Sequence, residues 1–380
     1  MDASNAAVAP LTPFRVLVCD DQPDVCEAMR LLLKGEGWQA VTVDSPEAVL
    51  RAAREEPFDL ILVDLNYTRD TTSGAEGMDL LASLEAQGNT APVMVMTAWS
   101  SFDLAVEAMR RGACDFIQKP WDNQRLLATI RKQADSDRRR KSELEIAANV
   151  QQKLFPRHLR PMQTLDYAAQ CVAAREVGGD YYDFLDAGPH ELSVILGDVS
   201  GKGVPAALLM ANLQAQFRSQ PPARLLAPAP LLESVNRHFF ESTAADRFAT
   251  LFYGVYNDRT RGLKYVNCAH SVPLLFRESG ELERLESTAT MLGAFARWSC
   301  TTDEVTLHAG DTLLLYSDGV TEAGIDHGEE FGEERLAKVL AANRRGPAST
   351  LANAVVDAVA AFSPGARHDD VTVVALRAKS

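Results

Sequence analysis

The chain has 380 residues, too many for one ordinary hydrophobic core and enough for two domains of typical size. Its 46% hydrophobic and 24% charged residues are the composition of a globular protein. The formal net charge of −14 gives no electrostatic support for binding to nucleic acid or to an anionic membrane, so we expect neither as a partner.

The cysteines and the N-terminus both indicate the cytoplasm. No two cysteines form a CxxC pair, which argues against a zinc site or a disulfide framework. The first twelve residues contain neither the positive charge nor the apolar segment of a signal peptide, and no run of about eighteen apolar residues could span a bilayer. We therefore expect a cytoplasmic protein with six reduced cysteines: Cys19, Cys26, Cys114, Cys171, Cys268 and Cys300.

After a flexible tail at residues 1–13, residues 14–130 alternate short apolar runs with helical patterns. The runs are apolar almost continuously, as strands buried on both faces of a parallel sheet are. Between them, apolar residues such as Val25, Met29 and Leu33 recur at helical spacing. This alternation predicts a doubly wound α/β domain. The predicted strands are Phe14–Cys19, Asp59–Val63, Val93–Thr97 and Cys114–Gln118.

Each predicted strand ends at a polar residue. Asp20 and Asp21 follow the first strand, Asp64 the second, Thr97 closes the third and Lys119 follows the fourth. Because the carboxyl ends of such strands converge on one crevice, we expect these side chains to meet there. Three carboxylates repel one another unless a divalent cation such as Mg²⁺ neutralises them, and one of them could then attack phosphorus. Singly these residues would indicate turns and surface, but five at successive strand ends favour a phosphoryl-accepting site.

Residues 14–130 resemble a CheY-like response-regulator receiver domain, which has a doubly wound, parallel five-stranded sheet. The resemblance implies that a sensor histidine kinase is the partner and that Asp64 is the phosphorylated residue. It also implies that Mg²⁺ is bound by Asp20, Asp21, Asp64 and the carbonyl of Asn66.

The same resemblance assigns three further residues around the phosphoryl group. Thr97 and Phe116 would form the aromatic–hydroxyl switch, and Lys119 would contact the phosphate. One departure is visible: the loop that follows Asp64 runs through residues 68–75 and is about five residues longer than is usual in receiver domains.

Residues 131–160 form a predicted helical linker. The segment 131–153 contains no Pro or Gly, and Ile146, Val150 and Leu154 recur at helical spacing. The register upstream of these residues is too polar for a strong coiled coil, so a homodimer through this helix is left open. We interpret the basic run at residues 138–141 as a solvated face and not as a nucleic-acid patch.

Residues 161–380 contain many short β-like runs mixed with helices, which predicts an α+β layered sandwich. The predicted strands include Ser193–Leu196, Thr250–Tyr256, Leu263–Asn267, Pro273–Phe276, Thr312–Tyr316 and Val371–Leu376. The predicted helices are Pro205–Phe217, Pro230–Phe240, Glu334–Leu340 and Ala348–Ala361.

Four aspartates stand beside glycines or predicted strands in this second part: Asp180, Asp198, Asp318 and Asp369, the last followed by Asp370. An aspartate beside a glycine is usually a turn, but a set of them at strand ends is rarer. Glycine lets the backbone approach an ion closely. An all-oxygen set without His or Cys suits Mg²⁺ or Mn²⁺, not zinc.

Two other kinds of site are rejected. The segment Ser200–Gly203 lacks the spacing and the Ser or Thr of a P-loop. No G-x-S-x-G nucleophile elbow exists to support a Ser-His-Asp hydrolase. His270 and His368 lie near the proposed site segments, where we interpret them as structural or supporting residues.

Residues 165–376 resemble the PPM-type, protein phosphatase 2C-like family, in its bacterial SpoIIE/RsbU branch. That resemblance implies two antiparallel sheets flanked by helices. Ala269 and Val272 depart from residues that the family often has as Gly and Pro. The matching stretches are Glu176–Phe184, Leu196–Met210, Arg247–Gly254, Asn267–Leu275, Leu313–Ala323, Phe331–Leu336 and His368–Val374.

The resemblance implies a phosphatase that uses two Mn²⁺ or Mg²⁺ ions to activate a water molecule. Asp198 would bridge the ions, with the Val199 carbonyl as a further ligand. Asp318 and Asp369 would bind one ion, and Asp180 would hold the other, directly or through water. Whether Asp370 takes part is left open.

Together these expectations describe a response regulator in which phosphorylation of Asp64 controls a metal-dependent protein serine/threonine phosphatase. In this branch the substrate is often an anti-anti-sigma (STAS-domain) protein. The main alternative is a non-enzymatic adaptor that binds a partner such as a sigma factor, but a degenerate domain should have lost metal aspartates and this one keeps all four. A DNA-binding regulator is disfavoured by the negative charge. The identity of the kinase and of the substrate, and the direction of control, are left open.

Overall fold

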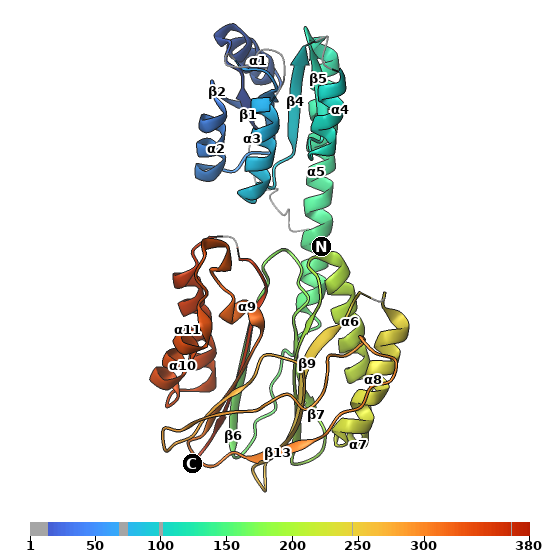
Figure 1. Ribbon diagram of the computed structural model, residues 1–380, viewed down its shortest axis with the longest axis vertical. Helices are drawn as coiled ribbons and strands as arrows, with labels where there is room; N and C mark the ends of the chain where they lie inside the picture. The colour runs from blue at the N-terminus through green and yellow to red at the C-terminus, as the bar shows by residue number, and fades with distance from the viewer. Residues whose placement is uncertain (1–13, 68–74, 99–101, 245, 366) are drawn as a thin grey trace, which may run out of the picture. The chain divides into compact units, whose positions relative to one another are not determined.

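The computed structural model describes residues 14–67, 75–98, 102–244, 246–365 and 367–380 (Figure 1). The chain divides into two compact units, residues 1–143 and 144–380, and each is described by itself. Within the described residues, no helix is both long and apolar enough to cross a membrane.

The first unit is a parallel sheet with helices on both faces. The strand order is β2-β1-β3-β4-β5, which confirms the predicted doubly wound architecture with five strands. Apolar residues of α1 and α5 form one core layer, and those of α2, α3 and α4 form the other. The elements are β1 (Arg15–Cys19), α1 (Pro23–Gly35), β2 (Gln39–Val43), α2 (Pro46–Glu55), β3 (Leu60–Asp64), α3 (Ala75–Ala86), β4 (Val93–Ala98), α4 (Phe102–Arg110), β5 (Asp115–Lys119) and α5 (Asn123–Gln152).

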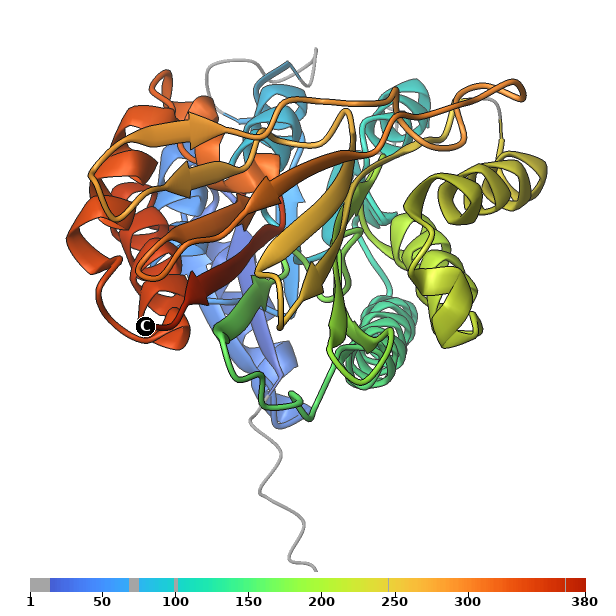
Figure 2. The same ribbon diagram turned by 90° about the horizontal axis from the view of Figure 1, so that it is seen from below.

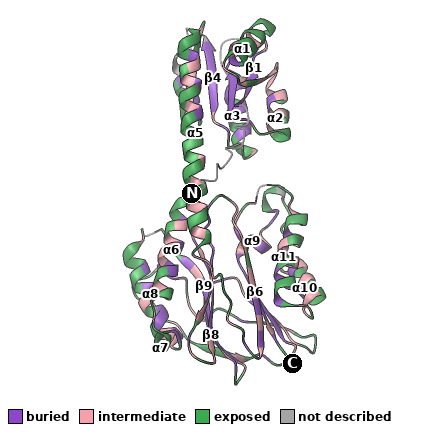
Figure 3. Cartoon of the chain, turned by 180° about the vertical axis from the view of Figure 1, so that it is seen from behind, coloured by how far each residue is buried: buried purple, intermediate pink, exposed green. Residues whose placement is uncertain are grey.

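Helix α5 is a single helix where the sequence analysis predicted two separate helical segments. The last helix of the first domain and the predicted linker helix are one uninterrupted helix that ends at Gln152. The part of the predicted linker from 153 to 160 is not helical. Ile146 and Val150 are 61% and 55% exposed, whereas Leu154 packs against the core of the second unit. Figure 3 shows exposed residues along α5.

The second unit has two antiparallel five-stranded sheets, ordered β13-β10-β9-β8-β7 and β12-β11-β14-β15-β6. Its strands are β6 (Leu165–Val172), β7 (Tyr181–Asp186), β8 (Glu191–Val199), β9 (Ala249–Asn257), β10 (Gly262–Cys268), β11 (Leu274–Phe276), β12 (Leu282–Arg284), β13 (Asp303–Thr306), β14 (Thr312–Tyr316) and β15 (Val371–Ala378). Its helices are α6 (Val204–Arg218), α7 (Pro222–Leu225), α8 (Pro228–Ser242), α9 (Asp318–Thr321), α10 (Gly332–Asn343) and α11 (Ala348–Phe362), with a short 3₁₀ turn at Ile325–His327.

These elements stack as four layers, which confirms the predicted sandwich of two antiparallel sheets flanked by helices. One core lies between the β7–β10 sheet and helices α6 and α8, and another lies between the two sheets. A third core packs helices α10 and α11 against the β14–β15 sheet. Figure 2 shows the two helical layers on opposite sides of the sheets. The loops at one end of these layers carry the predicted aspartates.

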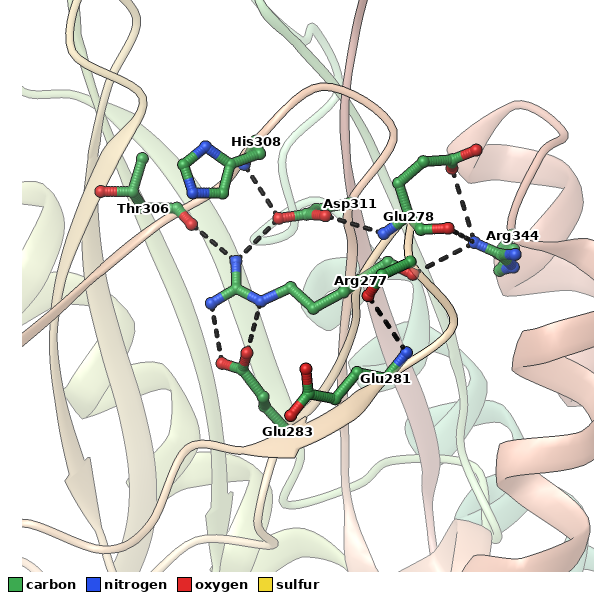
Figure 4. A network of polar contacts seen from close by, with 9 residues as sticks. Arg277, Glu278, Glu281, Glu283, Thr306, His308, Asp311 and Arg344 are labelled. Carbon is green, nitrogen blue, oxygen red and sulfur yellow. Dashed lines mark hydrogen bonds and ion pairs between the residues drawn. The ribbon is translucent and has the colours of Figure 1, made fainter.

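An ion-pair network fastens the β11–β12 hairpin to its surroundings (Figure 4). The Arg277 guanidinium donates two hydrogen bonds of 2.7 Å to Glu283 and one of 2.7 Å to Asp311. Asp311 is 2% exposed and also accepts hydrogen bonds from the backbone N–H groups of Glu278 and His308. Arg344 donates to the carbonyl oxygens of Arg277 and Glu278, which ties the start of the α10–α11 connection to the hairpin.

We predict that Arg277→Met lowers the free energy of unfolding of the second unit by about 2 kcal/mol, because it leaves the buried Asp311 carboxylate without its cation. Arg284→Met is the matched control, since the Arg284–Glu333 pair is partly exposed to solvent and should contribute much less to stability. Calorimetric unfolding of both variants measures the difference. Equal losses would show that burial of Asp311 does not decide the effect.

Candidate functional site

The first candidate site lies at the carboxyl edge of the parallel sheet. Asp20 follows β1, Asp64 ends β3 and Lys119 ends β5. The carboxylates of Asp20, Asp21 and Asp64 have ligand oxygens that all lie within 4.8 Å of one another. The Lys119 ammonium group donates hydrogen bonds of 2.5 Å to Asp20 and 2.6 Å to Asp64. The structure thus brings together the four charged residues that the sequence placed at separate strand ends.

Burial controls the electrostatics of this site. Asp64 is 4% exposed, and burial raises the pKa of its carboxyl group, although Lys119 opposes the rise. Burial alone would lower the pKa of Lys119, but its hydrogen bonds to Asp20 and Asp64 raise it overall. The Asn66 side-chain oxygen is buried and has no hydrogen-bond partner. The crowded carboxylates of Asp20, Asp21 and Asp64 have the chemistry of a Mg²⁺ site.

The two residues predicted for the switch lie on the neighbouring strands of the same sheet. Thr97 is 2% exposed on β4, and Phe116 on β5 packs against the core formed with α2–α4. The β4–β5 ladder pairs Val95 with Phe116 and Thr97 with Gln118. Most of the loop predicted to be longer than usual lies outside the described residues, which resume at Ala75, the first residue of α3.

The second candidate site gathers aspartates from four places in the sandwich. Asp180 precedes β7, Asp198 lies near the end of β8, Asp318 begins α9 after β14, and Asp369 stands shortly before β15. In the β7–β8 ladder, Tyr181 pairs with Gly197, which brings the Asp180 and Asp198 positions side by side.

Glycines allow the close approach of these segments. A Cβ atom on Gly179 would lie 2.7 Å from the Val199 carbonyl oxygen and 3.5 Å from an Asp198 carboxylate oxygen. A Cβ atom on Gly319 would collide with the Asp370 carbonyl oxygen. The glycines beside the aspartates, noted in the sequence as possible turns, are therefore required by packing within the site.

The aspartates of this cluster repel one another at close range. Asp180 is 3% exposed; burial, followed by the charges of Asp198 and Asp370, raises the pKa of its carboxyl group well above its usual value. Burial, followed by the charges of Asp318 and Asp369, raises the pKa of Asp198 to about 7. Such crowding costs free energy unless cations neutralise it.

A divalent cation fits this donor set. One oxygen of Asp180 is buried without a hydrogen-bond partner, and the donors are all carboxylate or carbonyl oxygens. Among the described residues, a group of three acidic ligand atoms within 4.8 Å of one another occurs in the first site alone, so the carboxylates of the second site are less tightly grouped.

The two adjacent aspartates before β15 differ in their surroundings. Asp370 accepts hydrogen bonds of 2.7 Å from the backbone N–H groups of both Ala174 and Gly179, so each of its oxygens already holds the loop that leads to Asp180. Asp369 instead forms an ion pair of 3.0 Å with Lys202. Sequence reasoning left the role of Asp370 open, and these contacts make Asp370 an organiser of the loop.

Lys202 is a site residue that sequence reasoning missed. Its ammonium group lies between the Asp369 carboxylate and the His368 carbonyl oxygen, to which it donates at 2.5 Å. The flanking Gly201 and Gly203 have φ angles of 99° and 72°, which other residues rarely adopt. Two such glycines around one lysine were the available signal, but neither the rejected P-loop nor the family match over Leu196–Met210 assigned a role to Lys202.

The raised pKa of Asp198 predicts a pH effect on stability in the presence of a chelator. Between pH 3.8 and about 7 the folded state binds more protons at Asp198 than the unfolded state does, so the free energy of unfolding falls as the pH rises through this window. We expect Asp198 to lower the free energy of unfolding by on the order of 2–4 kcal/mol across this window. Most of this decrease should be absent in Asp198→Asn. Mn²⁺ at pH 8 should restore the stability by binding the folded state.

Calorimetry at several pH values, with EDTA and with Mn²⁺, measures this effect. If wild type and Asp198→Asn show the same pH dependence in EDTA, Asp198 does not titrate as the geometry indicates.

Comparison with known proteins agrees with this geometry. The family described as Stage II sporulation protein E (SpoIIE) matches residues 188–379, half of the chain. The chain belongs to the SpoIIE family. The family described as response regulator receiver domain matches residues 16–131, so the first unit is a receiver domain. Both predicted resemblances, receiver and PPM-type phosphatase, are confirmed.

Individual relatives match either the receiver part or the phosphatase part of the chain. This chain is 31% identical to the phosphoserine phosphatase RsbU of Bacillus subtilis over 241 residues. These residues are 63% of this chain and 71% of RsbU. The receiver region is 36% identical over 117 residues to the transcriptional regulatory protein ZraR of Escherichia coli, covering 31% of this chain and 25% of that protein. The SiaA-PP2C domain of Pseudomonas aeruginosa shares the fold, with a TM-score of 0.56 and 23% identity over 64% of this chain and 98% of that one.

Proposed function

We propose that this protein is a response regulator whose output is metal-dependent hydrolysis of phosphoserine or phosphothreonine on a partner protein, under control of Asp64 phosphorylation. The observation that carries the proposal is the partly buried cluster of Asp180, Asp198, Asp318 and Asp369, whose mutual repulsion calls for divalent cations. A cluster kept intact in a domain of the SpoIIE family supports an enzyme over a non-enzymatic adaptor.

Within the second unit, Asp198 would bridge two Mn²⁺ or Mg²⁺ ions, with the Val199 carbonyl oxygen as a further ligand. Asp318 and Asp369 would hold one ion, and Asp180 the other. When bound, the ions supply Lewis acidity that lowers the pKa of water and stabilises charge on the transferring phosphoryl group. Glycines 178, 179 and 319 keep the backbone close enough for the carboxylates to converge, and Lys202 balances the charge of Asp369.

Within the receiver domain, Asp20, Asp21 and the Asn66 carbonyl would hold Mg²⁺ beside Asp64. A carboxylate oxygen of Asp64 would attack phosphorus and form the P–O bond of an acyl phosphate, while the bond from phosphorus to the kinase histidine breaks. Lys119, which now bridges Asp20 and Asp64, would then pair with a phosphoryl oxygen. Thr97 and Phe116 would report the change to the surface.

The partners follow from the two domains. A sensor histidine kinase would supply the phosphoryl group. The substrate would be a phosphoprotein, with an anti-anti-sigma (STAS) protein as the first candidate because RsbU is a phosphoserine phosphatase of the same family. The exposed side chains of Ile146 and Val150 on α5 leave an apolar stripe available for a homodimer.

The proposal is tested by the hydrolysis of p-nitrophenyl phosphate by the full chain. Because the second site consists of oxygen donors alone, we expect turnover with Mn²⁺ or Mg²⁺ and none in EDTA, with recovery when either ion is restored. Undiminished turnover in the chelator would overturn the two-metal proposal.

A further inference from the structure

His270 occupies the connection between the two sheets of the second unit. It lies between Cys268, the last residue of β10, and Leu274, the first residue of β11. These strands belong to different sheets. The side chain is 3% exposed, so it is enclosed between elements of both sheets.

The backbone around His270 is held in an unusual conformation. Ala269 has a φ of 51°, in the left-handed region that residues other than glycine rarely adopt. The backbone N–H of His270 donates a 2.8 Å hydrogen bond to the side-chain oxygen of Asn267, which is fully buried. A strained backbone persists where surrounding contacts determine it, and here the contacts determine the direction of the His270 side chain.

The imidazole holds a residue directly across from Asp198. Its Nδ1 lies 2.9 Å from the Thr250 hydroxyl oxygen. In the β8–β9 ladder, Thr250 is paired with Asp198. Side chains of directly paired residues project from the same face of an antiparallel sheet with Cβ atoms about 5 Å apart. The hydroxyl group bound by His270 therefore lies on the face from which Asp198 enters the acidic cluster.

The other ring nitrogen, Nε2, is buried and has no hydrogen-bond partner. Burial lowers the pKa of His270 to about 4, and the backbone of Tyr316 opposes this shift. Tyr316 ends β14, two residues before Asp318. A neutral ring has one N–H, and we assign it to Nε2, which leaves Nδ1 to accept a hydrogen bond from the Thr250 hydroxyl.

We propose that His270 is a positioning residue that fixes Asp198 through Thr250, and thereby sets the affinity of the acidic cluster for its divalent ions. The inference rests on the proposed function, because it concerns the ions that this cluster would bind. His270 acts through its contact with Thr250. Its ring is buried, so it is poorly placed to exchange a proton with a substrate.

The test is Mn²⁺ binding measured by isothermal titration calorimetry on the full chain. The receiver domain would bind ions as well. Asp198→Asn therefore serves as the baseline, because its remaining Mn²⁺ binding would come from sites outside the acidic cluster. We expect His270→Ala and Thr250→Val each to weaken Mn²⁺ binding to the cluster roughly 10-fold, the lower end of the effect of supporting residues around metals. Because the two residues act as one unit, the double variant should lose no more than the larger single loss.

Two further variants separate positioning from general stability. His270→Asn places an amide oxygen where Nδ1 lies, so it should retain the Thr250 contact and recover much of the affinity. Arg277→Met destabilises the same unit through a network that contacts neither His270 nor Thr250, and it should leave Mn²⁺ affinity unchanged.

The outcomes are distinguishable. Wild-type affinity in both His270→Ala and Thr250→Val would overturn the positioning role while leaving the proposed function intact. If His270→Ala does not fold, the nearly isosteric Thr250→Val decides alone. If wild type binds no more Mn²⁺ than Asp198→Asn does, the proposed function itself fails.

Discussion

Asp198→Asn should lower the phosphatase rate by at least about 10³-fold while the protein stays folded. Asp198 lies near the end of β8, where it interacts with the charges of Asp180, Asp318 and Asp369, so it is the member of the cluster best placed to bridge two ions. Replacing its carboxylate by an amide removes the charge that would hold both ions. It also removes repulsion from the ion-free cluster, so the variant should unfold at a higher temperature than wild type in EDTA.

The rate is measured with p-nitrophenyl phosphate and Mn²⁺, and folding by circular dichroism and calorimetry. Asp303→Asn is the matched control: it makes the same chemical change at an exposed acid on β13, outside the cluster, and should leave the rate unchanged. A variant Asp198→Asn that retains more than about a tenth of the wild-type rate would remove Asp198 from the bridging position.

The sequence predicted the chemistry of both sites because their residues stand at strand ends. Buried parallel strands are recognisable as continuous apolar runs, and Asp64 and Lys119 are placed by those runs alone. In the second unit, Asp198 lies near the end of β8 and Asp318 follows shortly after β14. Once the strands are assigned, topology brings the polar residues together.

Elements without such a signal were missed. The residues that helix α3 buries lie on one face, but Gly77 interrupts their apolar pattern in the sequence. That glycine is needed because a Cβ atom there would lie 2.7 Å from the Cα of Leu65. Strand β13 is mostly exposed and acidic, and it resembles a loop in the sequence. The Lys202–Asp369 contact joins distant parts of the chain, and only the pairing of the sheets reveals it.

The predicted boundary between receiver domain and linker, at residue 130, does not correspond to the end of a helix. The sequence contains no Pro or Gly from 123 to 152, so nothing in it marks an end of the first domain's last helix. The structure has one helix through this region, and Leu126 and Ile130 are buried while Ile146 and Val150 are exposed. A domain boundary within a continuous helix leaves no local signal.

Asp64→Ala should abolish phosphorylation of the chain and make its phosphatase rate insensitive to a phosphodonor. Asp64 is the carboxylate that ends β3, within 2.6 Å of the Lys119 ammonium group, and Asp20 and Asp21 lie close enough to share a cation with it. Incubation of wild type with a small phosphodonor and Mg²⁺ should therefore add one acyl phosphate, stable in acid and labile in alkali. Alanine offers no oxygen to attack phosphorus, so the variant should acquire none.

Mass spectrometry locates the phosphoryl group, and paired rates with and without phosphodonor measure the coupling. Asp79→Ala, at an exposed position on α3, is the control and should behave as wild type in both assays. Phosphorylation that persists in Asp64→Ala would place the acceptor elsewhere. A rate that responds to the phosphodonor in wild type and equally in Asp64→Ala would mean that control enters the phosphatase by another route. Coupling that depends on Asp64 requires that phosphorylation favour one of two arrangements of the chain, because a ligand shifts an equilibrium only by binding its states unequally.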